Sequence, residues 1–284
     1  MPQNWSSHDV ESNGIKLHYY RTGNGDKPPL ILCHGATDSG LCWTRVTRVL
    51  ERDYDVIMPD ARGHGLSDQP ASGYSNQDHA RDIAGLIQAL DLDNPAVGGH
   101  SMGAATTLRL VADYPDLASC AILEDPPMWS ANPPAAAPGR PNPRESMRRT
   151  VLDAHSSDLQ TTIDRGKTEH PSWSDEEWQP WADAKKHVST HFLDEMATVP
   201  PARNWRDLLA RVKVPMLLIT SDPELGGIVT PEASAEAQQI LPSLQVIRLE
   251  GAGHNIRREQ FDPFLAAVQT FLAAHARATT HTAT

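Results

Sequence analysis

The segment 95–105 reads PAVGGHSMGAA and decides the fold of this chain. An apolar strand pattern passes directly into a helical pattern there, with Ser101 at the junction. A strand that turns at once into a helix strains the residue at the turn, so the residues two positions away must be small. Gly99 and Gly103 meet that requirement. The pattern predicts a serine hydroxyl at a helix N-terminus, where anionic charge is favoured; the alternative is a glycine-rich tight turn with an idle serine.

Strand and helix patterns alternate on both sides of this segment. Strands are predicted at 15–21, 30–33, 54–58, 95–99, 119–123, 214–219 and 244–249, and helices at 41–50, 76–90, 102–114, 231–240 and 259–274. An Asn13-Gly14 turn predicts a hairpin whose first arm lies near Val10. The repeated unit implies an α/β fold with a mostly parallel sheet covered by helices.

Composition changes in the middle of the chain. Ten of the 23 prolines and five of the seven tryptophans fall within 127–207, where strand patterns disappear. We therefore expect a helical insertion, or cap, at 127–208. It interrupts a core domain made of 1–126 and 209–276, and the polar end 277–284 is expected to be a flexible tail.

The overall composition excludes several classes of protein. With 25 basic and 36 acidic residues the net charge is −11, so the chain lacks the basic surplus typical of nucleic-acid binders. Three cysteines without C-x-x-C spacing indicate a reducing compartment, and neither a signal-peptide pattern nor an apolar run long enough for a membrane span occurs. We expect a cytoplasmic protein that contacts no membrane, is a monomer or a homodimer, and acts on a small molecule.

A serine hydroxyl needs a base, and His254 is the best placed of the 13 histidines. It follows the strand at 244–249 in the compact loop EGAGH and precedes the last helix. The alternative is a histidine that faces solvent.

Three carboxylates compete to orient that imidazole. The chain order Ser, Asp, His favours Asp222, which follows the strand at 214–219. Asp125 follows the preceding strand and reaches the same sheet edge, and Glu224 lies in the same loop as Asp222. Asp222 is the first choice, Asp125 the alternative and Glu224 the third option.

The same chemistry needs hydrogen-bond donors for a developing oxyanion. The backbone N–H of Met102 follows the candidate nucleophile directly. The second donor is expected from Ala36, in the small-residue loop HGATDSG at 34–40, and His34 is expected to brace that loop.

These motifs together resemble the α/β-hydrolase fold superfamily over nearly the whole chain. The resemblance rests on His34-Gly35, on DARGHGLSD at 60–68, on GHSMG at 99–103 and on Gly253-His254, in this order. It implies an eight-stranded, mostly parallel sheet, a helical cap inserted after the sixth strand, and hydrolysis without a metal or organic cofactor. The stretch 60–68 is interpreted as a structural turn, since it lacks a phosphate-binding pattern.

Two departures from the family pattern bear on the site. Ala104 replaces a second glycine after the serine motif, and Asp222 lies in SDPE where relatives have Gly-x-x-Asp. Some relatives, among them haloalkane dehalogenases and zearalenone-type lactonases, place the acid after the sixth strand, which corresponds to Asp125. Ser101 disfavours the dehalogenase and epoxide hydrolase activities, because those branches use an aspartate nucleophile.

The substrate is predicted from the tryptophans and the acidic charge. Trp43, Trp129 and Trp181 are expected to line an apolar pocket, with packing inside the cap as the alternative. A neutral, fairly hydrophobic ester or lactone, cleaved through an acyl-enzyme, is the favoured substrate. Hydrolysis of a carbon–carbon bond in a diketone-like substrate is one alternative, and a non-catalytic binding protein on the same fold is another.

Overall fold

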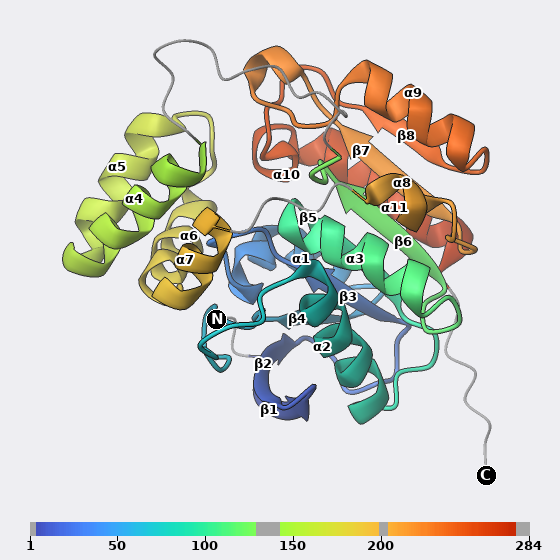
Figure 1. Ribbon diagram of the computed structural model, residues 1–284, viewed down its shortest axis with the longest axis horizontal. Coiled ribbons are helices and arrows are strands. Elements are labelled where there is room, and N and C mark those ends of the chain that lie inside the picture. The colour runs from blue at the N-terminus through green and yellow to red at the C-terminus, as the bar shows by residue number, and fades with distance from the viewer. Residues whose placement is uncertain (1–3, 129–142, 199–203, 277–284) are drawn as a thin grey trace.

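The fold is built on one eight-stranded sheet. The structure is a computed structural model that describes residues 4–128, 143–198 and 204–276. Its strands are β1 (Ser6–Ser12), β2 (Ile15–Arg21), β3 (Pro29–Cys33), β4 (Asp55–Pro59), β5 (Ala96–His100), β6 (Cys120–Glu124), β7 (Met216–Thr220) and β8 (Gln245–Arg248). They lie in the order β1-β2-β4-β3-β5-β6-β7-β8, with β1, β2 and β4 joined antiparallel and the rest parallel (Figure 1). The predicted eight-stranded, mostly parallel sheet is therefore confirmed.

Helices cover both faces of the sheet. One face packs against α2 (Asn76–Ala89), α3 (Met102–Asp113), α8 (Trp205–Leu209) and α9 (Pro231–Ile240). The other packs against the 3-10 turn η1 (Gly40–Trp43) and the helices α1 (Thr44–Leu50), α10 (Ile256–Glu259) and α11 (Phe261–His275). Of the six parallel strands, the five from β3 to β7 are buried along their whole length, as apolar strands between two helical layers must be.

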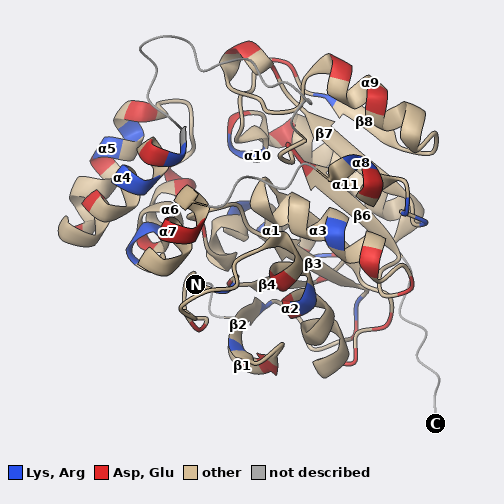
Figure 2. Ribbon diagram, in the orientation of Figure 1, with Lys and Arg blue, Asp and Glu red and all other residues tan. Residues whose placement is uncertain are grey.

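A group of helices is inserted between β6 and β7. It consists of α4 (Pro143–Ser156), α5 (Leu159–Glu169), α6 (Asp175–Lys186) and α7 (Thr190–Thr198). These helices form a lobe beside the sheet rather than a layer on it (Figure 1), and acidic and basic residues both occur on them (Figure 2). They occupy part of the segment predicted as a cap. Trp129 and the expected tail 277–284 lie outside the described residues.

In the described ranges, no helix combines the length and the apolar character needed to cross a bilayer. A short 3-10 turn, η2 (Pro223–Leu225), lies in the loop between β7 and α9. That loop, the loop after β3 and the loop after β8 all leave the carboxyl end of the sheet, where parallel strands place the residues that follow them.

Two glycines let α3 lie directly against the sheet. A Cβ added at Gly99 would meet the carbonyl of Gly103 at 2.3 Å, and one added at Gly103 would meet the carbonyl oxygen of Cys33 at 2.2 Å. Both contacts are with backbone atoms, which cannot rotate away. The requirement for small residues predicted from the sequence is therefore confirmed.

Replacing Gly103 with alanine is expected to destabilise the fold by about 2–3 kcal/mol, because the new methyl group must displace β3 or α3. Gly98→Ala is the matched control. Its Cβ would meet the terminal methyl of Leu32 at 3.2 Å, and a side chain can move aside. Urea unfolding of both variants measures the difference, and equal stabilities would show that the close approach is not required.

Candidate functional site

Ser101 lies in a strained turn between β5 and α3. Its backbone has φ 52° and ψ −112°, in a region that non-glycine residues rarely adopt. The Ser101 N–H donates to the carbonyl oxygen of Glu124 at 2.9 Å, which continues the pairing of β5 with β6. The turn therefore holds the serine at the end of its strand, beside the end of β6.

Asp125 is the carboxylate that contacts His254. Its Oδ2 lies 2.6 Å from His254 Nδ1, and the Asp125 side chain is fully buried while that of His254 is 30% exposed. The carboxylate also accepts hydrogen bonds from the N–H groups of Ile228 and Val229, at 2.9 to 3.0 Å. These donors replace the water that a buried carboxylate loses. An imidazole whose Nδ1–H donates to a carboxylate presents Nε2 as a base.

Asp222, the first choice for this contact, lies elsewhere. Its Oδ1 accepts from Arg248 Nη2 at 2.7 Å, and its Oδ2 accepts from the N–H of Gly251 at 2.8 Å. These contacts lower the pKa of Asp222, the hydrogen bond from Gly251 being the larger cause. The expectation of an Asp222–His254 contact is thus corrected: Asp222 braces the loop that carries His254. Glu224 lies on the exposed turn η2.

The loop of His254 is held close to the Ser101 turn. His100 Nε2 donates to the His254 carbonyl oxygen at 2.9 Å, and the two rings lie 4.6 Å apart. A Cβ at Gly253 would meet the carbonyl oxygen of Leu225 at 2.4 Å, so glycine is needed there. Ser101 Oγ makes no hydrogen bond within the described part of the chain.

The loop after β3 approaches the same turn. A Cβ at Gly35 would lie 2.6 Å from His100 Nδ1 and 3.5 Å from the Ser101 Cβ. Met102 is the first residue of α3, so its N–H has no partner within the helix. The side chains of Ala36 and Met102 pack against one apolar cluster. The two residues predicted to donate to an oxyanion therefore lie on the same side of the site.

Two buried histidines brace the loop after β3 through hydrogen bonds with backbone amides. The Ala61 N–H donates to His34 Nε2 at 2.9 Å, and the Thr37 N–H donates to His64 Nε2 at 3.3 Å. Burial lowers the pKa of both histidines, that of His64 strongly, so each stays neutral and accepts. The bracing role predicted for His34 is confirmed, and the stretch 60–68 forms turns that contact the same loop.

Two of the tryptophans predicted to line the pocket are buried beside cations. Trp43 is 2% exposed, and the guanidinium of Arg257 lies 4.4 Å from its ring. Trp181 is 5% exposed, and Lys185 Nζ lies 4.9 Å from its ring. The expectation that Trp43 and Trp181 line a substrate pocket is thus corrected, because their buried rings cover cations instead. Trp129, the third of them, is not among the described residues.

Those cations belong to a set of charges that the sequence analysis did not foresee. We call it the buried charge cluster; it comprises Asp38, Glu124, Glu177, Lys185, Arg257 and Arg258. Each of these side chains is at most 5% exposed, and three positive charges balance three negative ones. No pattern distinguishes these residues from surface charges in the sequence; only the pair of arginines shortly after His254 was a signal.

Asp38 is the centre of this cluster. Its Oδ2 lies 3.1 Å from both Arg257 Nη2 and Arg258 Nη2, and its Oδ1 lies 3.1 Å from Lys185 Nζ. Burial raises the pKa of Asp38, but Arg258, Lys185 and Arg257 outweigh burial and hold the pKa well below its usual value. Arg257 also binds Glu124, through its N–H at 2.9 Å and Nη1 at 3.2 Å. The cluster therefore joins the β3 loop, the end of β6, α10 and the inserted α6.

Apolar side chains of the inserted helices lie next to Ala36 and Met102. They belong to an apolar cluster that consists of Tyr74 with Val151, Val188, Phe192 and Leu193, and Leu152 and Met196 pack against it.

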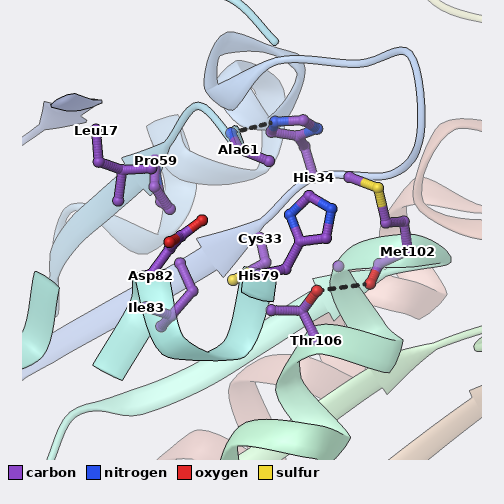
Figure 3. A pocket seen from close by; sticks show the side chains of 11 residues that line it. Leu17, Cys33, His34, Pro59, Ala61, His79, Asp82, Ile83, Met102 and Thr106 are labelled. Atoms are coloured by element: carbon purple, nitrogen blue, oxygen red, sulfur yellow. Dashed lines mark hydrogen bonds between the residues drawn. The ribbon is translucent and has the colours of Figure 1, made fainter. Parts of the chain in front are cut away.

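A separate small cavity is lined by His34, His79, Thr106 and Met102 (Figure 3). Its volume of about 20 Å³ suffices for one water molecule but not for an acyl group. Among the described residues, no group of three or more His, Cys, Asp or Glu side chains is arranged to hold a metal.

Comparison with known proteins identifies the family. A family model described as the alpha/beta hydrolase fold matches residues 28–257. The chain belongs to this family. It is 30% identical over 270 residues to N-formylmaleamate deformylase of Pseudomonas putida, covering 93% of this chain and 95% of the relative. The predicted resemblance is thus confirmed.

Other relatives match over similar lengths. The 2-(acetamidomethylene)succinate hydrolase of Mesorhizobium japonicum is 27% identical over 275 residues, 94% of this chain and 95% of the relative. Lipase 1 of Psychrobacter immobilis is 28% identical, covering 86% of this chain and 76% of the relative. The solved structure of an N-formylmaleamic acid deformylase from Pseudomonas putida S16 matches with a TM-score of 0.80 and 25% identity, covering 93% of this chain and 100% of the other. This protein is accordingly an enzyme of the hydrolase class.

Proposed function

We propose that this hydrolase uses Ser101 as its nucleophile, His254 as its general base and Asp125 as the acid that orients the base. The observation that carries the proposal is the 2.6 Å contact between His254 Nδ1 and Asp125, beside a serine held in a strained turn. Asp125 is buried and accepts from two backbone amides, so it stays in one orientation. It stabilises the imidazolium that forms when His254 takes a proton.

In the first half of the reaction, Ser101 Oγ attacks the carbonyl carbon of the substrate and its proton passes to His254 Nε2. The carbonyl π electrons move to oxygen, and the N–H groups of Ala36 and Met102 stabilise that oxyanion. When the oxyanion collapses, the bond to the leaving group breaks. His254 gives its proton to the leaving atom, which leaves an acyl group on Ser101.

In the second half, water attacks the acyl carbon and gives a proton to His254. Collapse of the second oxyanion breaks the bond to Ser101 Oγ, and the proton on His254 returns to that oxygen. The products are a carboxylic acid and the free enzyme, so the cycle needs neither a metal nor an organic cofactor.

The favoured substrate is a neutral, fairly hydrophobic ester or lactone. Phe192, Leu193 and Met196 on α7 bring apolar surface next to Ala36 and Met102. The cations beside the β3 loop are already matched by carboxylates, which favours a neutral substrate over an anionic one. Lipase 1, one of the relatives, is named as an enzyme that cleaves esters.

Cleavage of an N-acyl bond is a second candidate. Two relatives that match over more than nine tenths of this chain are named for substrates with a formyl or acetyl group on nitrogen. The same serine chemistry serves such a bond, with His254 giving its proton to the leaving nitrogen. Hydrolysis of a carbon–carbon bond remains the third candidate.

A fluorophosphonate is expected to label the protein once, at Ser101, since only an activated serine reacts. Ser101→Ala is expected to abolish labelling and to lower ester turnover by roughly 10³ to 10⁶. Intact-mass measurement and hydrolysis of p-nitrophenyl butyrate check this, with circular dichroism as the control for folding. If a folded Ser101→Ala variant hydrolysed the ester at a rate within tenfold of the parent enzyme, the proposed mechanism would be wrong.

Asp125→Asn is expected to lower kcat by about 10⁴, because an amide favours the wrong imidazole tautomer. Asp222→Asn, the matched control, is expected to leave kcat within about threefold of the parent, since a brace does not touch the reacting atoms. Steady-state kinetics of both variants decide between the two acids. A larger loss of kcat in Asp222→Asn than in Asp125→Asn would identify Asp222 as the acid instead.

A panel of p-nitrophenyl esters and N-acyl compounds tests the substrate class. If the apolar cluster receives the acyl chain, kcat/KM rises from acetate to hexanoate by about fourfold for each methylene, which corresponds to about 0.8 kcal/mol. N-formylmaleamate serves as the competing substrate. A kcat/KM for it that exceeds those of all the esters would favour the second candidate.

A further inference from the structure

Lys185 comes from the inserted helix α6 and reaches the loop after β3. Its Nζ donates to the carbonyl oxygen of Thr37 at 2.7 Å and to Asp38 Oδ1 at 3.1 Å, and the residue is 4% exposed. The ring of Trp181 lies beside the same ammonium group. A buried cation from the insertion is therefore bonded to the backbone next to Ala36.

The backbone it contacts is strained. Thr37 has φ 65°, and a β-branched side chain makes that region especially unfavourable. The Asp38 N–H donates to the Gly35 carbonyl oxygen at 3.1 Å and closes a turn with Ala36 and Thr37 at its centre. A positive φ at the third residue of such a turn orients its peptide units. Strain of this kind persists only when surrounding contacts hold it.

Two contacts hold Thr37, one from each side of the site. The core supplies His64, whose Nε2 accepts from the Thr37 N–H at 3.3 Å. The insertion supplies Lys185, which binds the Thr37 carbonyl oxygen. Asp38, the next residue, is bound by Lys185 and by two arginines of α10. Without Lys185, the core would still hold the N–H of Thr37, but its carbonyl group would lose the donor that fixes it.

We propose that Lys185 is a positioning residue that gives the Ala36 oxyanion donor its orientation, so that the donor is complete only when α6 is seated on the core. The inference rests on the proposed function, because it assigns Ala36 to the oxyanion. Lys185 acts through Thr37 and Asp38 and contacts no reacting atom. The insertion thereby supplies part of the catalytic geometry in addition to any surface that it offers to the substrate.

Lys186 provides a matched control on the same helix. Its Nζ also binds main-chain carbonyl oxygens, those of Ala154 and Ser157, but both lie within the insertion. Lys186→Met removes one lysine from α6 without touching the β3 loop. If Lys185→Met and Lys186→Met lowered kcat equally, the cause would be a loosened insertion and not a change at the Ala36 donor.

Lys185→Met is expected to lower kcat for p-nitrophenyl butyrate by about 10- to 100-fold, somewhat less than the loss of a whole oxyanion donor. KM is expected to change by less than about threefold, because the contact matters most once the oxyanion has formed. Affinity for a trifluoromethyl ketone, which forms an oxyanion on the serine, should fall by the same factor as kcat. Lys185→Arg is expected to recover part of the loss, and Lys186→Met to match the parent enzyme.

Removing a buried cation also leaves the cluster with one excess negative charge. The double variant Asp38→Asn with Lys185→Met restores the balance but not the bond to Thr37. We expect this double variant to fold with nearly the stability of the parent enzyme and to show the same loss of kcat as Lys185→Met. If Lys185→Met fails to fold, this double variant replaces it.

Hydrogen exchange separates the inference from the proposed function, since it needs no turnover. Amides of 34–40 are expected to exchange faster in Lys185→Met and in the double variant than in the parent or in Lys186→Met. Equal exchange, or equal kinetic losses in Lys185→Met and Lys186→Met, would overturn the inference. If the parent enzyme neither reacts with a fluorophosphonate nor cleaves any ester, the proposed function fails, and exchange alone decides whether Lys185 positions the loop.

Discussion

The close approach of α3 to the sheet is the constraint on which the site depends. Because Gly99 and Gly103 leave no room between helix and strands, the chain must reverse at Ser101, and it does so at φ 52°. The strain there costs on the order of 1–3 kcal/mol and is held by packing on both sides. Through its N–H the same residue is bonded to Glu124, so the turn also places the end of β6 beside the serine.

Which carboxylate contacts His254 follows from how a buried carboxylate is solvated. Asp125 is fully buried next to His254, and the loop between β7 and α9 supplies amide donors from Ile228 and Val229. That loop therefore supplies donors to the carboxylate that follows the neighbouring strand β6, and its own Asp222 makes no contact with His254. Asp222 lies at its start and faces Arg248, where it ties β7 to β8. If both carboxylates were buried at the same imidazole, the free energy needed to remove their water would exceed what a single contact with His254 provides.

Local patterns predicted what depends on local chemistry. Strand and helix positions follow from periodicity, and the need for glycine at Gly99 and Gly103 follows from a single turn, so both were predictable. The carboxylate that contacts His254 was not predictable, because Asp125 and Asp222 follow neighbouring parallel strands and reach the same edge. Only the fold of a distant loop distinguishes them. Trp181 was misassigned for a related reason, since an aromatic ring suits a pocket or a buried cation equally well.

The buried charge cluster is the part of the structure that sequence patterns conceal most fully. Charged residues are almost always exposed unless paired, so Asp38 and Lys185 give no sign of burial until the fold brings them together. Burying matched charges adds little stability, because desolvation offsets their attraction. Such a cluster does, however, penalise every arrangement that separates its members. Since Asp38 is in the β3 loop and Lys185 in the insertion, that penalty acts on the seating of α6 and, through Thr37, on the loop that faces Ser101.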